Sequence, residues 1–163
     1  MDIRPIAPDE RPAVLSLVRR AYAEFEPYLE PDRWIRMNTN LAGVVAPAAE
    51  GLLLVAVRNG ELVGTVTYLP PGPRSYVYVP TEWAVIRVLA VDRAARGHGI
   101  GRRLVADCLH RATADGVPAV GLHTAAMMHA ARALYQSAGF TPRREFEHLG
   151  ARFCVYGLDL TAR

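Results

Sequence analysis

The stretch RAARGHGIGRRL, residues 93–104, sets three glycines on alternating positions directly before a predicted helix. Gly97, Gly99 and Gly101 each weaken a helix, so the chain must keep them for another purpose. Glycine accepts positive φ and has no Cβ to block a bulky anion, so backbone amides at a helix N-terminus can converge on one oxyanion. Four arginines in the same stretch add positive charge. A diphosphate is therefore the expected ligand of this turn.

The spacing of the glycines also fits a tight strand-to-helix turn that binds nothing, and the residues alone leave that alternative open. Two familiar phosphate motifs are excluded. The P-loop ends in Gly-Lys-Ser/Thr, and the chain contains no lysine. The dinucleotide fingerprint needs a glycine at its sixth position, which is Arg102 when counted from Gly97.

Hydrophobic periodicity and turn signals predict the other elements of the chain. The expected helices cover 8–25, 31–48, 99–114 and 129–138, and the expected strands cover 52–58, 61–69, 83–91, 119–124, 144–148 and 152–159. The unit 83–124 is strand, glycine turn, helix and strand, and a connection of that length permits parallel pairing with a right-handed crossover. Asn59-Gly60 predicts a tight hairpin. The expected fold class is α/β, with about four helices around one mixed, mostly antiparallel sheet.

Length and composition limit the class of protein. With 163 residues, of which 51% are hydrophobic, the chain suits one domain with a sizeable core. It has no apolar run near the roughly 18 residues of a membrane span and no signal-peptide pattern, so a cytoplasmic protein without membrane contact is expected. The arginines that carry its positive charge are scattered, which argues against nucleic acid as a partner. Cys108 and Cys154 lack metal spacing and are expected in the core, so no metal is predicted.

Two motifs resemble those of a known family. Residues 96–101 (RGHGIG) resemble the Arg/Gln-x-x-Gly-x-Gly/Ala signature of the GNAT superfamily of acetyl-CoA-dependent N-acetyltransferases, and they follow 89–92 (LAVD) as they do there. Residues 131–135 (ARALY), followed by Gly139-Phe140, resemble the second signature of that family. The similarity is close over 83–142. It implies a single GNAT-like domain over 1–163, whose parallel strand pair splays apart, and acetyl-CoA as the co-substrate.

The resemblance also implies a set of coenzyme-binding residues. Backbone groups of Leu89 to Val91 would bind the pantetheine arm and polarise the thioester, beside a local bulge that splays this strand from the strand of His123. Amides from about Gly97 to Arg102 would hold the pyrophosphate. The full set is Leu89, Ala90, Val91, Arg96, Gly97, His98, Gly99, Ile100, Gly101, Arg102, Met128 and Arg132. Met128 stands where many relatives carry an asparagine that bonds the pantetheine, so its contact would be apolar unless the adjacent His129 takes that place.

The expected chemistry needs an acid and a base. A protonated amine cannot attack until it loses a proton, and the leaving thiolate needs one. Tyr135 occupies the family's position for the acid, although a core tyrosine is the alternative. The glutamate that several relatives place four residues before Leu89 is absent, and Glu82 could act through water instead. Other relatives use a glutamate at the position of His123, where a neutral imidazole could serve as base or simply pack.

The acceptor is the least specified part of the prediction. The segment 22–34 interleaves acidic and aromatic residues, which suits an ammonium ligand or a solvated helix end. The loop 70–82 could be a lid or a dimer contact, and the resemblance allows a homodimer. The predicted function is acetyl transfer to a primary amine, on a small molecule or a peptide, by direct attack in a ternary complex. The alternatives are transfer of a longer acyl group and a non-catalytic module that senses CoA.

Overall fold

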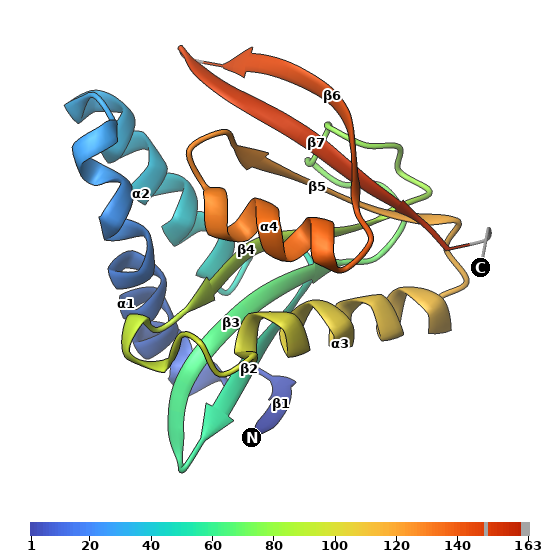
Figure 1. The fold of residues 1–163 in the computed structure, drawn as a ribbon. Coiled ribbons are helices and arrows are strands. Elements are labelled where there is room, and N and C mark those ends of the chain that lie inside the picture. The colour runs from blue at the N-terminus through green and yellow to red at the C-terminus, as the bar shows by residue number, and fades with distance from the viewer. Residues whose placement is uncertain (149, 161–163) are drawn as a thin grey trace. The chain divides into compact units, whose positions relative to one another are not determined.

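The structure is a computed structural model that describes residues 1–148 and 150–160. Its strands form one seven-stranded sheet in the order β1-β2-β3-β4-β5-β7-β6 (Figure 1). The chain divides into two compact units, residues 1–67 with 88–104 and residues 68–87 with 105–163, and it passes from one unit to the other within two strands and one helix. The expected single domain over 1–163 stays a prediction.

The four helices are α1 (Arg11–Tyr22), α2 (Pro31–Val45), α3 (Ile100–Ala114) and α4 (His129–Ser137). The strands are β1 (Asp2–Pro5), β2 (Leu52–Arg58), β3 (Glu61–Leu69), β4 (Ala84–Val91), β5 (Ala119–Ala125), β6 (Thr141–His148) and β7 (Ala151–Asp159). Short 3-10 helices cover η1 (Pro8–Glu10), η2 (Ala23–Tyr28) and η3 (Arg93–Ala95). The described β4–β5 register is parallel, whereas β1–β2, β5–β7 and β6–β7 are antiparallel. The predicted α/β fold with one parallel pair is therefore confirmed.

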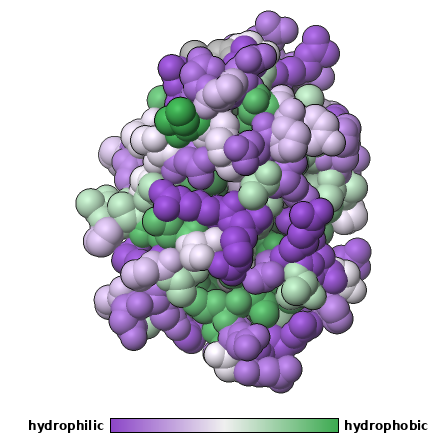
Figure 2. All heavy atoms as spheres, turned by 90° about the vertical axis from the view of Figure 1, so that its left-hand side faces the viewer, coloured by the Kyte–Doolittle hydropathy of each residue, from purple (hydrophilic) through white to green (hydrophobic). Residues whose placement is uncertain are grey.

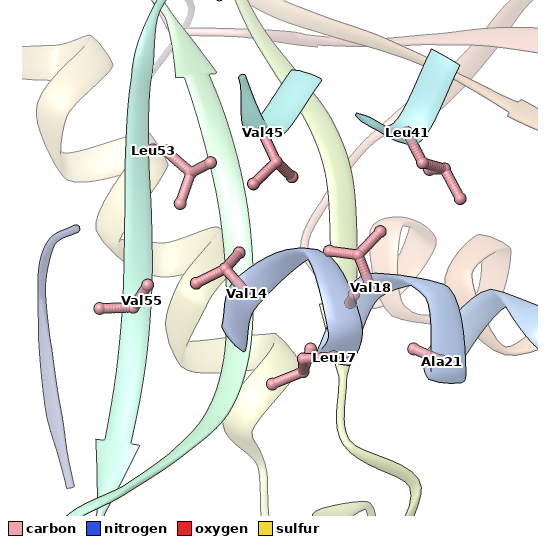
Figure 3. Close-up of a cluster of buried hydrophobic side chains, with 9 residues drawn as sticks. Val14, Leu17, Val18, Ala21, Leu41, Val45, Leu53 and Val55 are labelled. Atoms are coloured by element: carbon pink, nitrogen blue, oxygen red, sulfur yellow. The ribbon is translucent and has the colours of Figure 1, made fainter. Parts of the chain in front are cut away.

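In the first unit, α1 buries one face against β2 and α2. Its apolar residues recur at helical spacing and join side chains of α2 and β2 in one cluster (Figure 3). The buried members of this cluster are Val14, Leu17, Val18, Ala21, Leu41, Val45, Leu53, Val55 and Ala90. The Asn59-Gly60 turn between β2 and β3 has positive φ at both residues, as the hairpin signal predicts.

The predicted helix over 8–25 is wrong at both ends. The chain forms the 3-10 turn η1 before α1, and after Tyr22 it tightens into η2, which contains Pro27. Because proline lacks an N–H and crowds the preceding turn, the α-helix cannot continue through this segment. The predicted helix over 31–48 likewise ends at Val45, because Ala46 precedes Pro47 and adopts extended backbone angles.

In the second unit, β5, β7 and β6 lie side by side in that order (Figure 1). The loop 70–83 packs on two strand glycines of this unit: a Cβ at Gly121 would lie 2.6 Å from Val79 Cγ1, and one at Gly157 would lie 3.1 Å from Trp83 Cζ3. Arg74 donates hydrogen bonds to the carbonyls of Trp83 and Pro80, at 2.6 and 2.7 Å. The loop is therefore anchored within its unit.

The surface view in Figure 2 shows hydrophilic residues over most of one face, with hydrophobic residues exposed between them. Within residues 1–148 and 150–160, no helix combines the length and apolar character that crossing a membrane requires. Cys108 and Cys154 are free thiols and both are buried, as expected. Burial raises the pKa of the Cys108 thiol to about 12, so it stays protonated.

Candidate functional site

The strand that leads to the glycine turn is irregular near its end. Val88, within β4, has a φ of +50°, a left-handed conformation that a β-branched residue rarely adopts. The Asp92 amide then donates to the Val63 carbonyl at 2.8 Å, and the Asp92 carboxylate accepts from the Ala94 amide at 3.1 Å. This departure from extended geometry agrees with the bulge expected in this strand.

The glycine turn has the backbone that the sequence predicts at two of its three glycines. Gly97 and Gly99 have φ of +84° and +75°, and a Cβ built on either meets no atom within 4 Å. Their absent side chains therefore leave open space beside the backbone. Gly101 differs, because it lies in the first turn of α3 and adopts helical geometry. The first backbone bond of α3 runs from Arg103 to the Gly99 carbonyl, so the preceding amides lack partners inside the helix.

Gly64, which the sequence analysis did not single out, allows the turn to lie close to β3. A Cβ at Gly64, on β3, would lie 3.1 Å from both Ile100 Cγ2 and Leu104 Cδ1, and 3.2 Å from the Ala90 carbonyl oxygen. These distances are shorter than most real Cβ contacts, so Gly64 lets the start of α3 lie close to β3. A lone glycine inside a strand pattern is the signal that points to such an approach.

The polar side chains of the turn have different surroundings. Arg96 forms an ion pair with Glu24 at 3.0 Å and donates to the Ala21 carbonyl at 3.3 Å, so its guanidinium faces the end of α1. His98 Nδ1 lies 3.1 Å from two backbone carbonyl oxygens, and therefore donates its proton there. The Arg102 side chain is exposed and forms no ion pair or hydrogen bond among the residues described.

The end of α1 is also tied to β4 at two further points. The Tyr22 hydroxyl donates to the Leu89 carbonyl at 3.3 Å, and Arg20 pairs with Asp92 at 3.2 Å. The rings of Tyr22 and Phe25 meet edge to face at 5.9 Å. Of the acidic residues expected to attract an ammonium, Glu24 is therefore already engaged by Arg96.

In the second unit, Tyr135 is a buried residue of α4. The residue is 6% exposed, and its ring lies edge to face against Phe140, with centroids 5.9 Å apart. The Phe140 amide donates to the Tyr135 carbonyl at 3.0 Å, across Gly139 with its φ of +103°. The Gly-Phe pair of the second signature thus closes the helix and fixes the tyrosine ring.

The two other predicted contacts near α4 have partners within the protein. Met128 precedes the helix, and its sulfur accepts a bond from the Thr124 hydroxyl at 3.4 Å. Arg132 donates to the Tyr156 hydroxyl at 3.1 Å and to the Ala126 carbonyl at 3.0 Å, so its guanidinium holds the end of β5. The adjacent His129 is exposed.

His123, on β5, lies among aromatic rings rather than in open solvent. Its Nδ1 is 2.7 Å from the Tyr76 hydroxyl, and its ring centroid is 4.5 Å from that of Tyr78. Phe146 and Phe153 complete the surroundings at 6.4 and 5.7 Å. We call these five residues, Tyr76, Tyr78, His123, Phe146 and Phe153, the aromatic cluster.

Burial sets the protonation of the central pair of this cluster. Desolvation, followed by the charges of Arg87 and His148, lowers the pKa of His123 to about 4, so its imidazole is neutral at neutral pH. Desolvation also raises the pKa of Tyr76, whose phenol stays protonated. The hydroxyl then donates to Nδ1, which leaves the proton of the neutral imidazole on Nε2. Glu82, the other candidate base, is exposed in the loop before β4.

No group of three or more His, Cys, Asp or Glu side chains arranged to hold a metal ion occurs within residues 1–148 and 150–160. Most residues that the resemblance assigns to the coenzyme would contribute backbone groups, at the end of β4 and in the glycine turn. The diphosphate of a coenzyme fits the glycine turn, because amides and open glycine space suit phosphoryl oxygens.

Residues 12–140 match the family model described as Acetyltransferase (GNAT) family. The mycothiol acetyltransferase of Thermomonospora curvata is 34% identical over 136 residues, covering 72% of this chain and 42% of that protein. N-acetyltransferase family 8 member 3 of Rattus norvegicus is 36% identical over 92 residues, covering 56% of this chain and 39% of that protein. The chain thus spans less than half the length of these curated relatives. Among solved structures, yncA of Salmonella typhimurium, determined with its cofactor acetyl-CoA, has a TM-score of 0.71 at 19% identity, covering 98% of this chain and 93% of that one.

Proposed function

The chain belongs to the acetyltransferase (GNAT) family, and from this membership we propose that it transfers the acetyl group of acetyl-CoA to a primary amine by direct attack in a ternary complex. The family expected from the sequence is confirmed. The activity, the co-substrate, the amine, the mechanism and the roles of individual residues are the proposal. The observation that carries it is the glycine turn, with positive φ at Gly97 and Gly99 and open space beside both.

Coenzyme binding is proposed at the end of β4 and in the glycine turn. The backbone of Leu89, Ala90 and Val91 would bind the pantetheine arm. The amides from Gly97 to Arg102 would bind the pyrophosphate, because they stand at the positive end of α3. The exposed Arg102 side chain can add a charge-assisted bond. Arg96 supports the turn from the side of α1 instead, since Glu24 and the Ala21 carbonyl engage its guanidinium.

Tyr135 is proposed as the acid that protonates the departing thiolate. Phenols as a class are protonated at neutral pH and can donate a proton to sulfur. The contact with Phe140 holds the ring of Tyr135 in one orientation, which supports a donor in a fixed position.

The proton of the attacking amine is proposed to leave by His123 or, through water, by Glu82. The bond from Tyr76 occupies the acceptor nitrogen of His123, and a pKa of about 4 makes the imidazole a weak base at neutral pH. A pH profile separates the two candidates. If His123 is the base, His123→Asn removes the acidic limb that kcat/KM shows after correction for the fraction of free amine, and Glu82→Gln leaves it in place. If Glu82 is the base, the two variants exchange these results.

The function is tested by release of free thiol from acetyl-CoA in the presence of a panel of amines, together with direct measurement of CoA binding by calorimetry. Acetyl transfer predicts amine-dependent release and tight CoA binding. Tight binding without turnover on any amine or peptide would favour the CoA-sensing module. Faster release from butyryl-CoA than from acetyl-CoA would favour the longer acyl group. A homodimer stays a prediction, which sedimentation velocity tests.

A further inference from the structure

Arg87, on β4, is a half-buried cation without an anionic partner. Its Cζ lies 5.5 Å from the centroid of the Tyr76 ring. Among the residues described, its guanidinium forms no ion pair and no hydrogen bond. A contact between a cation and the face of an aromatic ring uses none of the N–H donors of the guanidinium. Five N–H donors in a planar fork therefore remain available to a ligand.

The positive charges of Arg74 and Arg144 act on Tyr76 as that of Arg87 does. Arg144 donates to the Tyr78 carbonyl at 2.8 Å and lies 5.5 Å from the Phe146 centroid, and it too forms no ion pair among the described residues. The nearby imidazole of His123 is neutral at neutral pH. An acceptor that carried only positive charge would meet repulsion here, whereas a carboxylate would be attracted. The planar guanidinium of Arg87 matches a carboxylate with two parallel bonds.

The aromatic cluster beside these arginines presents flat apolar surface. Tyr78 and Phe146 are stacked at 4.9 Å and 15°, and Phe146 and Phe153 are stacked at 5.4 Å and 14°. All three rings are half-buried, so part of each remains accessible. A planar apolar group can pack against such a surface and gain both buried area and ring–ring contact.

Arg87 lies beside the aromatic cluster and is also close in sequence to the residues proposed to bind the pantetheine arm. Arg87 directly precedes Val88 and stands two residues before Leu89, where the proposed function puts the pantetheine arm. We propose, resting on that function, that the acceptor amine carries a carboxylate and a large apolar or aromatic group. Arg87 binds the carboxylate, and the aromatic cluster packs against the apolar group. Amino acids with aromatic side chains and their relatives have this chemistry.

The first test compares three amines that differ at one group: L-phenylalanine, L-phenylalaninamide and 2-phenylethylamine. The measured quantity is kcat/KM for acetylation, corrected for the fraction of free amine. We expect L-phenylalanine to exceed both neutral analogues by at least about tenfold. In Arg87→Met this advantage disappears, because only the carboxylate loses its partner. Arg87→Lys retains part of it, since a single charge remains without the planar fork.

The matched control is Arg143→Met, because Arg143 also lies near an aromatic ring, 5.8 Å from the Trp83 centroid, but pairs with Asp159 at 3.3 Å. This variant should keep the preference for L-phenylalanine. Equal kcat/KM for the three amines in the unmodified protein would overturn the proposal. So would an equal loss on all three amines in Arg87→Met, with an unchanged melting temperature.

A second measurement does not need turnover. 3-Phenylpropanoate carries the ring and the carboxylate without an amine, and 3-phenylpropanamide is its neutral counterpart. Calorimetry in the presence of CoA should detect the carboxylate bound at least about tenfold more tightly, and Arg87→Met should remove the difference. If no amine is acetylated but this binding is found, the proposed function fails and the Arg87 site stands. If amines are acetylated and both ligands bind equally, the Arg87 site fails and the function stands.

Discussion

At the scale of single residues, substitutions at Gly99 can distinguish two roles of the glycine: allowing a positive φ and leaving room for the coenzyme. Alanine at Gly99 would need a φ of +75°, which costs about 1 kcal/mol in stability, whereas asparagine tolerates that region better. Because a Cβ there meets nothing within 4 Å, the protein itself leaves room for either side chain. We expect Gly99→Asn to recover most of the stability lost in Gly99→Ala, yet both variants should bind CoA at least about tenfold more weakly, as measured by calorimetry.

Gly60 supplies the control, because it has a φ of +78° in the β2–β3 hairpin and equally open surroundings. Gly60→Ala should lose a similar free energy of unfolding and keep its affinity for CoA. If Gly99→Asn binds CoA normally, the open space beside the turn does not belong to the coenzyme, and only the turn geometry matters there.

Tyr135→Phe tests the proposed acid. Tyr135 is 6% exposed and its ring packs on Phe140, and phenylalanine preserves that packing. We expect kcat to fall by about 10²-fold or more, while the dissociation constant of CoA changes little. Tyr68→Phe is the comparison, since its hydroxyl donates to Asp115 at 2.6 Å and its loss should lower stability without affecting turnover. A parallel loss of turnover and CoA affinity in Tyr135→Phe would make the tyrosine a structural support.

The site could be predicted from the sequence only where a local pattern carries it. The positive φ of Gly97 and Gly99 and the Tyr-to-Phe contact across Gly139 follow from spacing within one turn or one helix end. The partners of Arg96 and His123 do not, because Glu24 and Tyr76 lie 72 and 47 residues away in the chain. Hydrophobic periodicity does not indicate which side chains from such distant segments meet. The sequence therefore could not show that Arg96 of the motif pairs with a residue next to α1.

At the scale of elements, the end of α1 is linked to the glycine turn by the Arg96–Glu24 pair. Both side chains are 30–38% exposed, so the pair should contribute no more than about 1 kcal/mol to stability. A double-mutant cycle with Arg96→Met and Glu24→Gln, followed by urea unfolding and CoA calorimetry, separates its roles. If Arg96 acts by holding the turn, both single variants weaken CoA binding to a similar extent and their effects are not additive. A loss confined to Arg96→Met would instead indicate direct contact with phosphate.

The elements themselves were predictable where side chains repeat with a strong period, as in the apolar face of α1 and the β2–β3 hairpin. The misses have local causes. β1 has four residues and ends in Pro5, too short a segment for an alternation to register. β6 begins at Thr141, earlier than predicted, because Pro142 resembles a strand breaker yet is tolerated on an edge strand beside a register shift. Several predicted boundaries near prolines were therefore wrong, whereas the order of the predicted elements was right.

At the scale of the whole molecule, two residues of the described part of the chain have lowered pKa values that contribute to the response to acid in separate ranges. The pKa of His123 is lowered to about 4 from an ordinary 6.5, chiefly by burial. As the pH falls below 6.5, the unfolded chain takes up a proton that the folded protein refuses, so stability declines until about pH 4. The pKa of Glu10 is lowered to about 2 from an ordinary 4.5, chiefly by its bond with Arg4 and then by the Ala7 amide. Its contribution is present above pH 4.5 and is lost as the pH falls toward 2.

The two ranges can be separated by unfolding in urea between pH 7 and pH 3. His123→Asn should flatten the decline between pH 6.5 and 4, where the histidine accounts for at most about 3 kcal/mol. Glu10→Gln should flatten only the part below pH 4.5, and by about 1 kcal/mol, because its pair with Arg4 is partly exposed. Trp34 and Trp83 lie in different units, so single Trp→Phe variants report each unit by fluorescence. An unchanged slope above pH 4.5 in His123→Asn would mean that His123 takes up its proton at its ordinary pKa in the folded protein, so that burial does not lower this pKa.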